Sequence, residues 1–244
     1  RFADGRGRVA ARGGRRFAEP VLLAADVPFG FPAAFAEVYQ EHGGFLQWLH
    51  ARGESAADWA RLVVKSVYEQ SPTSPFVTCR AGERKAAGRF PLRRCDALTG
   101  AESVFWCVGG KQVGKAALQF WRETLLPLRK HFGQRLAVWP FEDAANAAVV
   151  VAECYPAMLY ERVWGRSVTK SDPVAVVDAV AARRQAQPSL CSDKTWLHAV
   201  SSDDEFDAFT AALALSEAPG DLLALPPGSA SAEGWMLLLE DRAP

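Results

Sequence analysis

The chain has 244 residues, 49% of them hydrophobic, and its 28 basic side chains balance its 28 acidic ones. A chain of this length and composition can bury a sizeable core, so a folded protein rather than a disordered one is expected. The zero net charge excludes a generally basic nucleic-acid-binding surface. Any site for a polyanion must therefore be local.

The cysteine and histidine patterns exclude several site classes. Five cysteines are widely spaced and never form C-x-x-C, which predicts reduced thiols in a cytosol. The four histidines show no zinc-binding spacing, so oxygen ligands remain the open class. No apolar run reaches the roughly 20 residues that cross a bilayer, and the N-terminal charges do not fit a signal peptide. A cytoplasmic protein without a membrane partner is expected.

The first half of the chain predicts few strands. Residues 1–18 favour a β-hairpin around a glycine-rich turn, and the apolar run 21–25 predicts a buried strand that ends at Asp26. Residues 33–68 carry apolar positions at helical spacing and predict a helical pair. Residues 70–100 lose this periodicity and hold prolines and basic side chains, which predicts a long loop.

The second half alternates strands and helices. Strands are predicted at 104–108, 136–139 and 147–152, and helices at 116–130, 173–184 and 203–216, before a Pro/Gly/Ser-rich connector at 219–231 and an apolar segment at 234–239. The strand at 147–152 ends before Glu153, so a second carboxylate follows a strand. This alternation predicts a three-layer α/β domain with residues 33–135 as an insertion.

An acidic stretch begins the last long helix. Ser202 followed by Glu205 forms a capping-box pattern. Asp203 and Asp204 then lie in the first turn, where acidic side chains stabilise a helix by up to about 1 kcal/mol without any further function. Asp207 adds a carboxylate one turn further along the same face, where like charges repel unless a divalent cation offsets them.

Four short blocks follow one another along residues 21–239: Ala25-Asp26-Val27-Pro28-Phe29-Gly30-Phe31-Pro32, Glu153-Cys154-Tyr155-Pro156, Asp203-Asp204-Glu205-Phe206-Asp207-Ala208 and Glu233-Gly234-Trp235. In this order they resemble the domain-of-unknown-function 429 family, which is predicted to be ribonuclease-H-like. The region 33–135 matches only loosely.

The resemblance implies a single ribonuclease-H-like domain over residues 1–244, with a mixed sheet flanked by helices and a helical, basic insertion at about 33–135. It also implies a metal-dependent nuclease that cleaves nucleic acid. The residues expected to bind Mg²⁺ or Mn²⁺ and to carry the reaction are Asp26, Glu153, Asp204 and Asp207, with Asp203 as an alternate metal ligand.

Two purely structural interpretations stay open beside these catalytic roles. Asp26 has the alternative of capping the turn at 28–30, and Glu153 that of a buried partner of an arginine. The superfamily's first strand also carries a leading aspartate, and no strand bearing one precedes Asp26 here. Either that strand lies upstream or the site is incomplete, in which case the chain is an inactive binding module of the same fold.

The stretch from Gly109 to Lys115 fits most of a phosphate-binding loop, G-x-x-x-x-G-K. Ala116 replaces the Ser or Thr that such a loop uses to hold magnesium, so nucleotide binding is not expected. A glycine-rich turn with solvated lysines is the simpler interpretation. Lys111 and Lys115 would alternatively hold a backbone phosphate of a nucleic acid at this helix start.

Basic side chains also gather between residues 80 and 94. Such a run is often only a solvated loop, but it is the best local footprint for a polyanion in this chain. The residues expected to contact nucleic acid here are Arg80, Arg84, Lys85 and Arg89. Lys170 follows the Glu153 block and is expected to be a surface lysine, with a position near the acidic site as the alternative.

Overall fold

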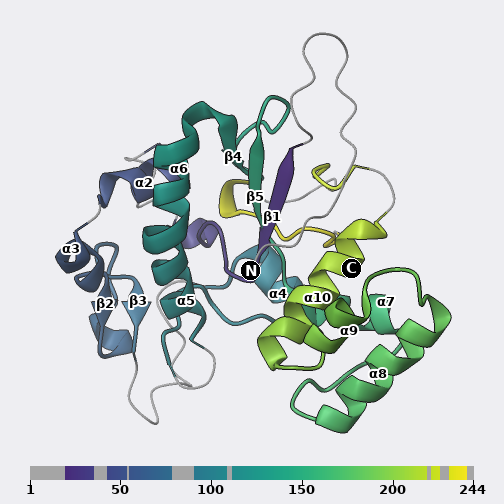
Figure 1. Ribbon diagram of the computed structural model, residues 1–244. Helices are drawn as coiled ribbons and strands as arrows, with labels where there is room; N and C mark the ends of the chain where they lie inside the picture. The colour runs from purple at the N-terminus through teal and green to yellow at the C-terminus, as the bar shows by residue number, and fades with distance from the viewer. Residues whose placement is uncertain are drawn as a thin grey trace.

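The computed structural model describes residues 20–35, 43–53, 55–78, 91–108, 112–218, 221–225 and 231–240. Figure 1 shows a small central sheet with helices on both sides of it. The hairpin predicted at 1–18 lies outside the described residues.

The central sheet has three strands in the order β1–β5–β4. These are β1 (Val21–Ala25), β5 (Val149–Glu153) and β4 (Leu136–Val138), each close to its predicted range. Both strand pairs are parallel, and Ala25 is level with Glu153. The described strands therefore form a parallel sheet, not the mixed one that the resemblance implies. The register places the residues that follow β1 and β5 at one edge of the sheet.

The two faces of the sheet bury different partners because successive side chains of a strand point to opposite sides. Val151 and Val138 belong to the main aromatic core, together with α2 (Phe45–Ala51) and the helix that contains Trp121. Val150 and Ala152 pack instead against the C-terminal segment around Trp235. The arrangement is layered, as the alternation of strands and helices predicts.

One long helical stretch covers the first face (Figure 1). It consists of α5 (Val113–Phe120), a π-helical turn η4 (Trp121–Leu125) and α6 (Leu126–Phe132). Lysine, arginine and histidine residues fill its last turn, where cations favour the helix dipole. The helix predicted at 116–130 is confirmed.

The second half ends in a helical group that packs around Phe206 and Trp196. Its members are η6 (Pro156–Leu159), α7 (Tyr160–Trp164), α8 (Pro173–Ala186), α9 (Asp193–His198) and α10 (Asp203–Ser216). The predicted bounds of α10 are confirmed at both ends. The hydroxyl of Ser202 accepts a hydrogen bond from the Glu205 amide at 3.2 Å. The reciprocal half of the capping box is replaced, because the Glu205 carboxylate instead bonds Ser201 and His198.

The region 33–108 differs most from its prediction. Beside α2 and α3 (Ala56–Ala60) it forms a second parallel pair, β2 (Val63–Val64) with β3 (Phe76–Val77), and the short helices η2 (Val67–Glu69) and α4 (Arg94–Thr99). The strand predicted at 104–108 is wrong: Val104 and Phe105 form a buried turn, and Trp106 makes only an isolated bridge to Val77. Two further short helices complete the described elements, η5 (Gly133–Arg135) and η7 (Ser231–Glu233).

Candidate functional site

Carboxylates from two elements meet beyond the end of β1. Asp26 follows the strand directly, and the acidic face of α10 supplies Asp203, Asp204 and Asp207. The negative charges of Asp207, Glu153 and Asp204 all act on the Asp26 carboxyl, so these groups share one electrostatic environment. Asp26 and the acidic face of α10 therefore influence each other electrostatically, while the predicted convergence of strand-end and helix carboxylates on a shared cation stays a prediction. We call Asp26, Asp203, Asp204 and Asp207 the carboxylate cluster.

Asp207 is the buried member of the cluster, with 7% of its surface exposed. The Tyr160 hydroxyl donates a hydrogen bond to one of its oxygens, and the Lys170 ammonium donates to the other at 2.5 Å. Lys170 therefore lies at the acidic site, which is the alternative to the surface role expected for it. The repulsion expected at Asp207 is offset by this lysine without a metal ion.

Asp26 has the most altered ionisation of the cluster. Partial burial of its carboxyl and the charge of Asp207 raise its pKa from 3.8 to about 7, although Lys170 opposes the shift. Other parts of Asp26 remain exposed to solvent. The pKa shift therefore comes from the protein packed around the carboxyl and from its acidic neighbours. A carboxyl of this kind exchanges its proton near neutral pH.

The two partners of Asp207 are altered as well. Burial and the hydrogen bond to Asp207 raise the pKa of the Tyr160 hydroxyl, which stays protonated and acts as a donor. Burial lowers the pKa of the Lys170 ammonium, but its hydrogen bond to Asp207 and the surrounding carboxylates outweigh that effect and raise it. Lys170 is therefore a cation at any neutral pH.

Glu153 forms its hydrogen bonds with residues outside the carboxylate cluster. Its two oxygens accept from the two terminal nitrogens of Arg93, both at 2.7 Å, and Arg93 and Glu153 are 1% and 3% exposed. Asp96 binds the other side of the same guanidinium. Burial lowers the pKa of Arg93, but Glu153 and Asp96 outweigh it and hold the pKa well above its ordinary value. Of the two roles open to Glu153, this is the buried partner of an arginine.

The Arg93–Glu153 pair also holds the chain just after Asp26. The Phe29 amide donates to Glu153 at 2.9 Å, and Arg93 donates to the Phe29 carbonyl at 2.8 Å. The indole of Trp121, in the π-helical turn, donates to the Pro28 carbonyl at 3.1 Å. These bonds fix the backbone groups of Pro28 and Phe29 in the turn that follows Asp26. The sequence grouped Arg93 with a basic loop and gave no signal for this role.

Gly30 is needed where this turn meets the C-terminal segment. Its φ is 98°, and a Cβ there would lie 2.1 Å from the Glu233 carbonyl oxygen. Gly234 has a φ of 86°, and a Cβ there would lie even closer to the Phe29 carbonyl oxygen. Only glycine fits two backbones at this separation. The Glu233 carboxylate joins the same junction by accepting from the amides of Ala33 and Arg94.

The carboxylate cluster has the ligand chemistry that a divalent cation prefers, but it does not have the geometry of a metal site. Carboxylate oxygens are the ligands that Mg²⁺ and Mn²⁺ prefer. Within the described ranges, however, no three Asp, Glu, His or Cys side chains are placed to hold one ion. Glu153 is committed to Arg93, and Asp207 is bonded to Lys170. Coordination at Asp207 therefore requires Lys170 to move.

The other predicted contacts fall mostly outside the described residues. Arg80, Arg84, Lys85, Arg89 and Lys111 all do so. Lys115 lies exposed in the first turn of α5. In the described part of the chain, no helix is long and apolar enough to cross a membrane.

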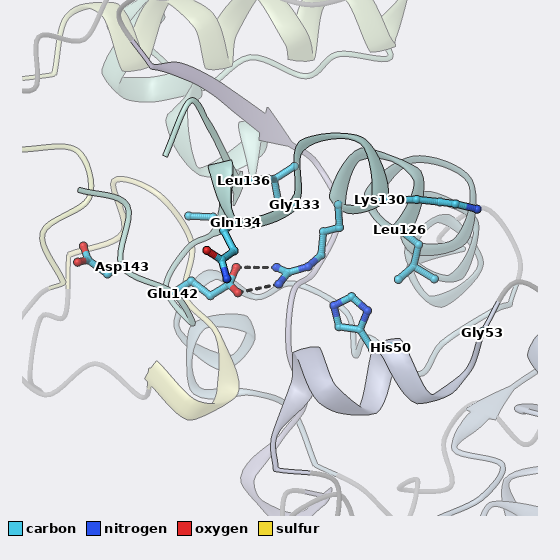
Figure 2. A pocket seen from close by; sticks show the side chains of 11 residues that line it. His50, Gly53, Leu126, Lys130, Gly133, Gln134, Leu136, Glu142 and Asp143 are labelled. Atoms are coloured by element: carbon cyan, nitrogen blue, oxygen red, sulfur yellow. Dashed lines mark hydrogen bonds and ion pairs between the residues drawn. The ribbon is translucent and has the colours of Figure 1, made fainter. Parts of the chain in front are cut away.

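A separate cavity of about 560 Å³ lies between α2, α6 and the start of β4. Arg129, Glu142 and His50 are among its lining residues, and Figure 2 shows Glu142 and the His50 ring from two sides of it. The Arg129–Glu142 pair is held at 2.6 and 2.8 Å, and Glu142 also accepts from the Val138 amide. Burial and the charge of Arg129 lower the pKa of His50, which is therefore neutral at pH 7. The cavity's central charges cancel each other, unlike those of the carboxylate cluster.

Comparisons with protein families, with curated proteins and with solved structures gave no match. The resemblance to the domain-of-unknown-function 429 family therefore stays a prediction from the four sequence blocks.

Proposed function

We propose that this protein is a divalent-metal-dependent nuclease that hydrolyses phosphodiester bonds of nucleic acid at the carboxylate cluster. The observation that carries the proposal is the electrostatic influence of the acidic face of α10 on Asp26, which follows β1. A ribonuclease-H-like fold belongs to the same proposal. The C-terminal helix with acidic residues supports it, whereas the parallel order β1–β5–β4 of the described strands differs from the mixed sheet that the resemblance implies.

Three side chains have definable roles in this proposal. Asp26 has a pKa of about 7 in the metal-free protein, which a bound divalent cation would lower, so its role in the proposal is that of a metal ligand. Tyr160 fixes the orientation of the Asp207 carboxylate from the buried side. Lys170 neutralises part of the charge that would repel a phosphate.

No three of the described side chains are placed to hold one ion, so binding of Mg²⁺ or Mn²⁺ by Asp26, Asp207 and one of Asp203 or Asp204 would require these side chains and Lys170 to move. A bound ion would supply Lewis-acid activation of water and of the leaving oxygen. Glu153 is left out of this ligand set because Arg93 occupies both of its oxygens. The set is thus smaller than the one the sequence predicts.

A second candidate function is an inactive binding module of the same fold. Two observations favour it. An arginine neutralises Glu153 and a lysine neutralises Asp207, so neither carboxylate needs a metal ion to offset its charge. The two candidates differ in whether removing a cluster carboxylate abolishes a reaction.

The test is cleavage of labelled single-stranded DNA and RNA with Mn²⁺, with Mg²⁺ and with chelator. We expect metal-dependent cleavage that falls at least about a hundredfold in Asp26→Asn and Asp207→Asn. Asp178→Asn, an exposed aspartate of α8, is the matched control and should cleave like the wild type. Wild-type protein that cleaves neither substrate with either ion favours the binding module. Full activity in Asp207→Asn would place the reaction elsewhere.

A further inference from the structure

A second cavity, of about 540 Å³, lies where the ends of α2 and α3 meet the turn at residues 71–74. Its lining includes two arginines, two hydroxyl residues and a buried leucine, namely Arg52, Arg61, Thr73, Ser74 and Leu62. Figure 1 shows α2 and α3 on one side of the molecule and α10 on the other. The cavity, which we call the arginine pocket, is therefore separate from the carboxylate cluster.

Arg52 directly follows α2, and its side chain has unused hydrogen-bonding capacity. Its guanidinium lies over the indole of Trp48, 5.1 Å from the ring centroid, and this contact holds the charged group in place. Its Nε–H is buried and has no hydrogen-bond partner. A cation after a helix C-terminus is favourable in itself, but a guanidinium that only capped α2 would bond the last carbonyls of the helix. Within the described ranges no carbonyl or carboxylate accepts from it, so Arg52 has donors to offer a ligand.

Arg61, which follows α3, is also only weakly engaged. In the described chain its guanidinium makes one bond, to Asp58 at 3.4 Å, and the side chain is 79% exposed. An ion pair this exposed contributes about 0 to 1 kcal/mol. Arg129 of the other cavity differs, because two of its nitrogens bond Glu142 at 2.6 and 2.8 Å. The arginine pocket thus carries two cations against one loosely held carboxylate, whereas the central charges of the other cavity are paired.

The turn that forms another wall of the pocket is held firmly. Ser71 and Ser74 exchange two backbone hydrogen bonds, at 3.3 and 3.1 Å. The Ser74 hydroxyl donates to the Arg61 carbonyl at 2.8 Å, which ties the turn to the end of α3. The hydroxyls of Thr73 and Ser71 share a hydrogen bond at 3.2 Å. The pocket is therefore formed before a ligand binds, as small-molecule sites usually are.

The lining chemistry favours one class of anion. A phosphate monoester carries about two charges and three terminal oxygens, so it can accept from two separate guanidinium groups and from a hydroxyl at once. A carboxylate has two oxygens, which a single guanidinium fork satisfies. The pocket's volume lies in the range of roughly 300 to 1,000 Å³ that small-molecule sites occupy. Ala51 and Leu62 add apolar contacts for the body of such a ligand.

We propose that the arginine pocket binds a small phosphate monoester. Its phosphate group accepts from Arg52, displaces Asp58 from Arg61 and accepts from the Thr73 hydroxyl. The inference goes beyond the proposed function, because the pocket shares no residue with the carboxylate cluster and its ligand is not cleaved there.

The test is isothermal titration with phenyl phosphate, which combines a phosphate monoester with an apolar body. We expect saturable binding to the wild type and at least about tenfold weaker binding to Arg52→Met and to Arg61→Met, because each variant loses charge-assisted hydrogen bonds. Arg52→Lys keeps the charge without the planar fork and should lose part of the affinity. Asp58→Asn should bind more tightly, because it removes the competitor for Arg61. Arg162→Met, at an exposed arginine of α7, is the matched control and should bind like the wild type.

Circular dichroism checks that each variant is folded, and Arg52→Gln replaces Arg52→Met if the methionine variant is not. The proposal is overturned if the wild type binds neither phenyl phosphate nor inorganic phosphate, or if Arg162→Met loses as much affinity as the two pocket variants. Benzoate that binds as tightly as phenyl phosphate would assign the pocket to carboxylates instead. A single-stranded DNA that binds through Arg52 and Arg61, while phenyl phosphate does not bind, would assign the two arginines to a nucleic-acid backbone and also contradict the proposal.

Discussion

Residues of one chemical type perform different tasks in this protein because their surroundings differ. Asp26 is raised in pKa by burial and by acidic neighbours, whereas Glu153 faces an arginine that uses both of its oxygens. Asp207 lies between a tyrosine hydroxyl and a lysine ammonium. The sequence marks all three as acids at element ends, but the partners that separate their roles come from distant parts of the chain. The sequence left a position near the acidic site open for Lys170 only as an alternative, and it gave no signal for the role of Arg93.

The ionisation of Asp26 predicts a pH-dependent stability. Its carboxyl has a pKa of about 7 in the folded protein against an ordinary value of 3.8, so the folded protein holds the proton more tightly than the unfolded chain. The stabilisation from this proton is complete below the unfolded pKa and is lost as the pH rises through 7. Asp26→Asn stays neutral throughout, so we expect its advantage in melting temperature over wild type to grow between about pH 5 and pH 8.

The measurement is thermal unfolding by circular dichroism in chelator, so that no divalent ion contributes. Asp178→Asn, on the exposed surface of α8, should show no such trend. A melting-temperature difference between Asp26→Asn and wild type that is constant across the pH range would contradict the raised pKa.

At the level of elements, the predictions that succeeded rest on strong periodicity. The bounds of α10 follow from a serine cap and a long apolar face, and β1 and β5 follow from short aliphatic runs. In the region 33–108, α2 and α3 agree with the predicted helical pair, but β2 and β3 were missed. These strands have two residues each and are held by distant backbone bonds, such as that from the Val77 amide to the Phe105 carbonyl. A strand this short leaves no periodic pattern in the sequence.

The junction between β5, α4 and the turn after β1 depends on the buried Arg93–Glu153 pair. Glu153→Gln keeps an acceptor for the Phe29 amide but loses the charge that faces Arg93. Asp96 still neutralises the Arg93 guanidinium in this variant, but one guanidinium N–H then faces an amide NH2 and loses its acceptor, so we expect the free energy of unfolding to fall by about 2 kcal/mol. Urea denaturation measures this change.

Glu142→Gln provides the matched comparison, because Glu142 also faces an arginine through two oxygens but its side chain is 29% exposed. Solvent screens that pair, so its loss should cost about 1 kcal/mol or less. Equal losses of unfolding free energy in the two variants would mean that burial does not increase the contribution of Glu153 to stability.

At the scale of the whole molecule, acidic and basic residues are equal in number, at 28 each. The carboxylate cluster repels phosphate groups, so a nucleic acid must be held by basic side chains elsewhere. The best such run in the sequence is Arg80, Arg84, Lys85 and Arg89, which lie outside the described residues. The fold alone does not determine this contact, because it depends on charge rather than on packing.

Replacing these four residues together by alanine should therefore weaken binding of single-stranded nucleic acid by lowering the number of phosphate contacts. Each lost contact should make the slope of log affinity against log salt less negative by about 0.7. Fluorescence anisotropy over a salt series, with the reaction blocked by chelator, measures both the affinity and the slope. The control replaces four exposed bases of the described chain, Lys65, Arg162, Arg166 and Lys194, by alanine, which removes the same total charge. If both quadruple variants lose the same affinity and the same slope, net charge alone governs binding and the basic run is not the nucleic-acid contact.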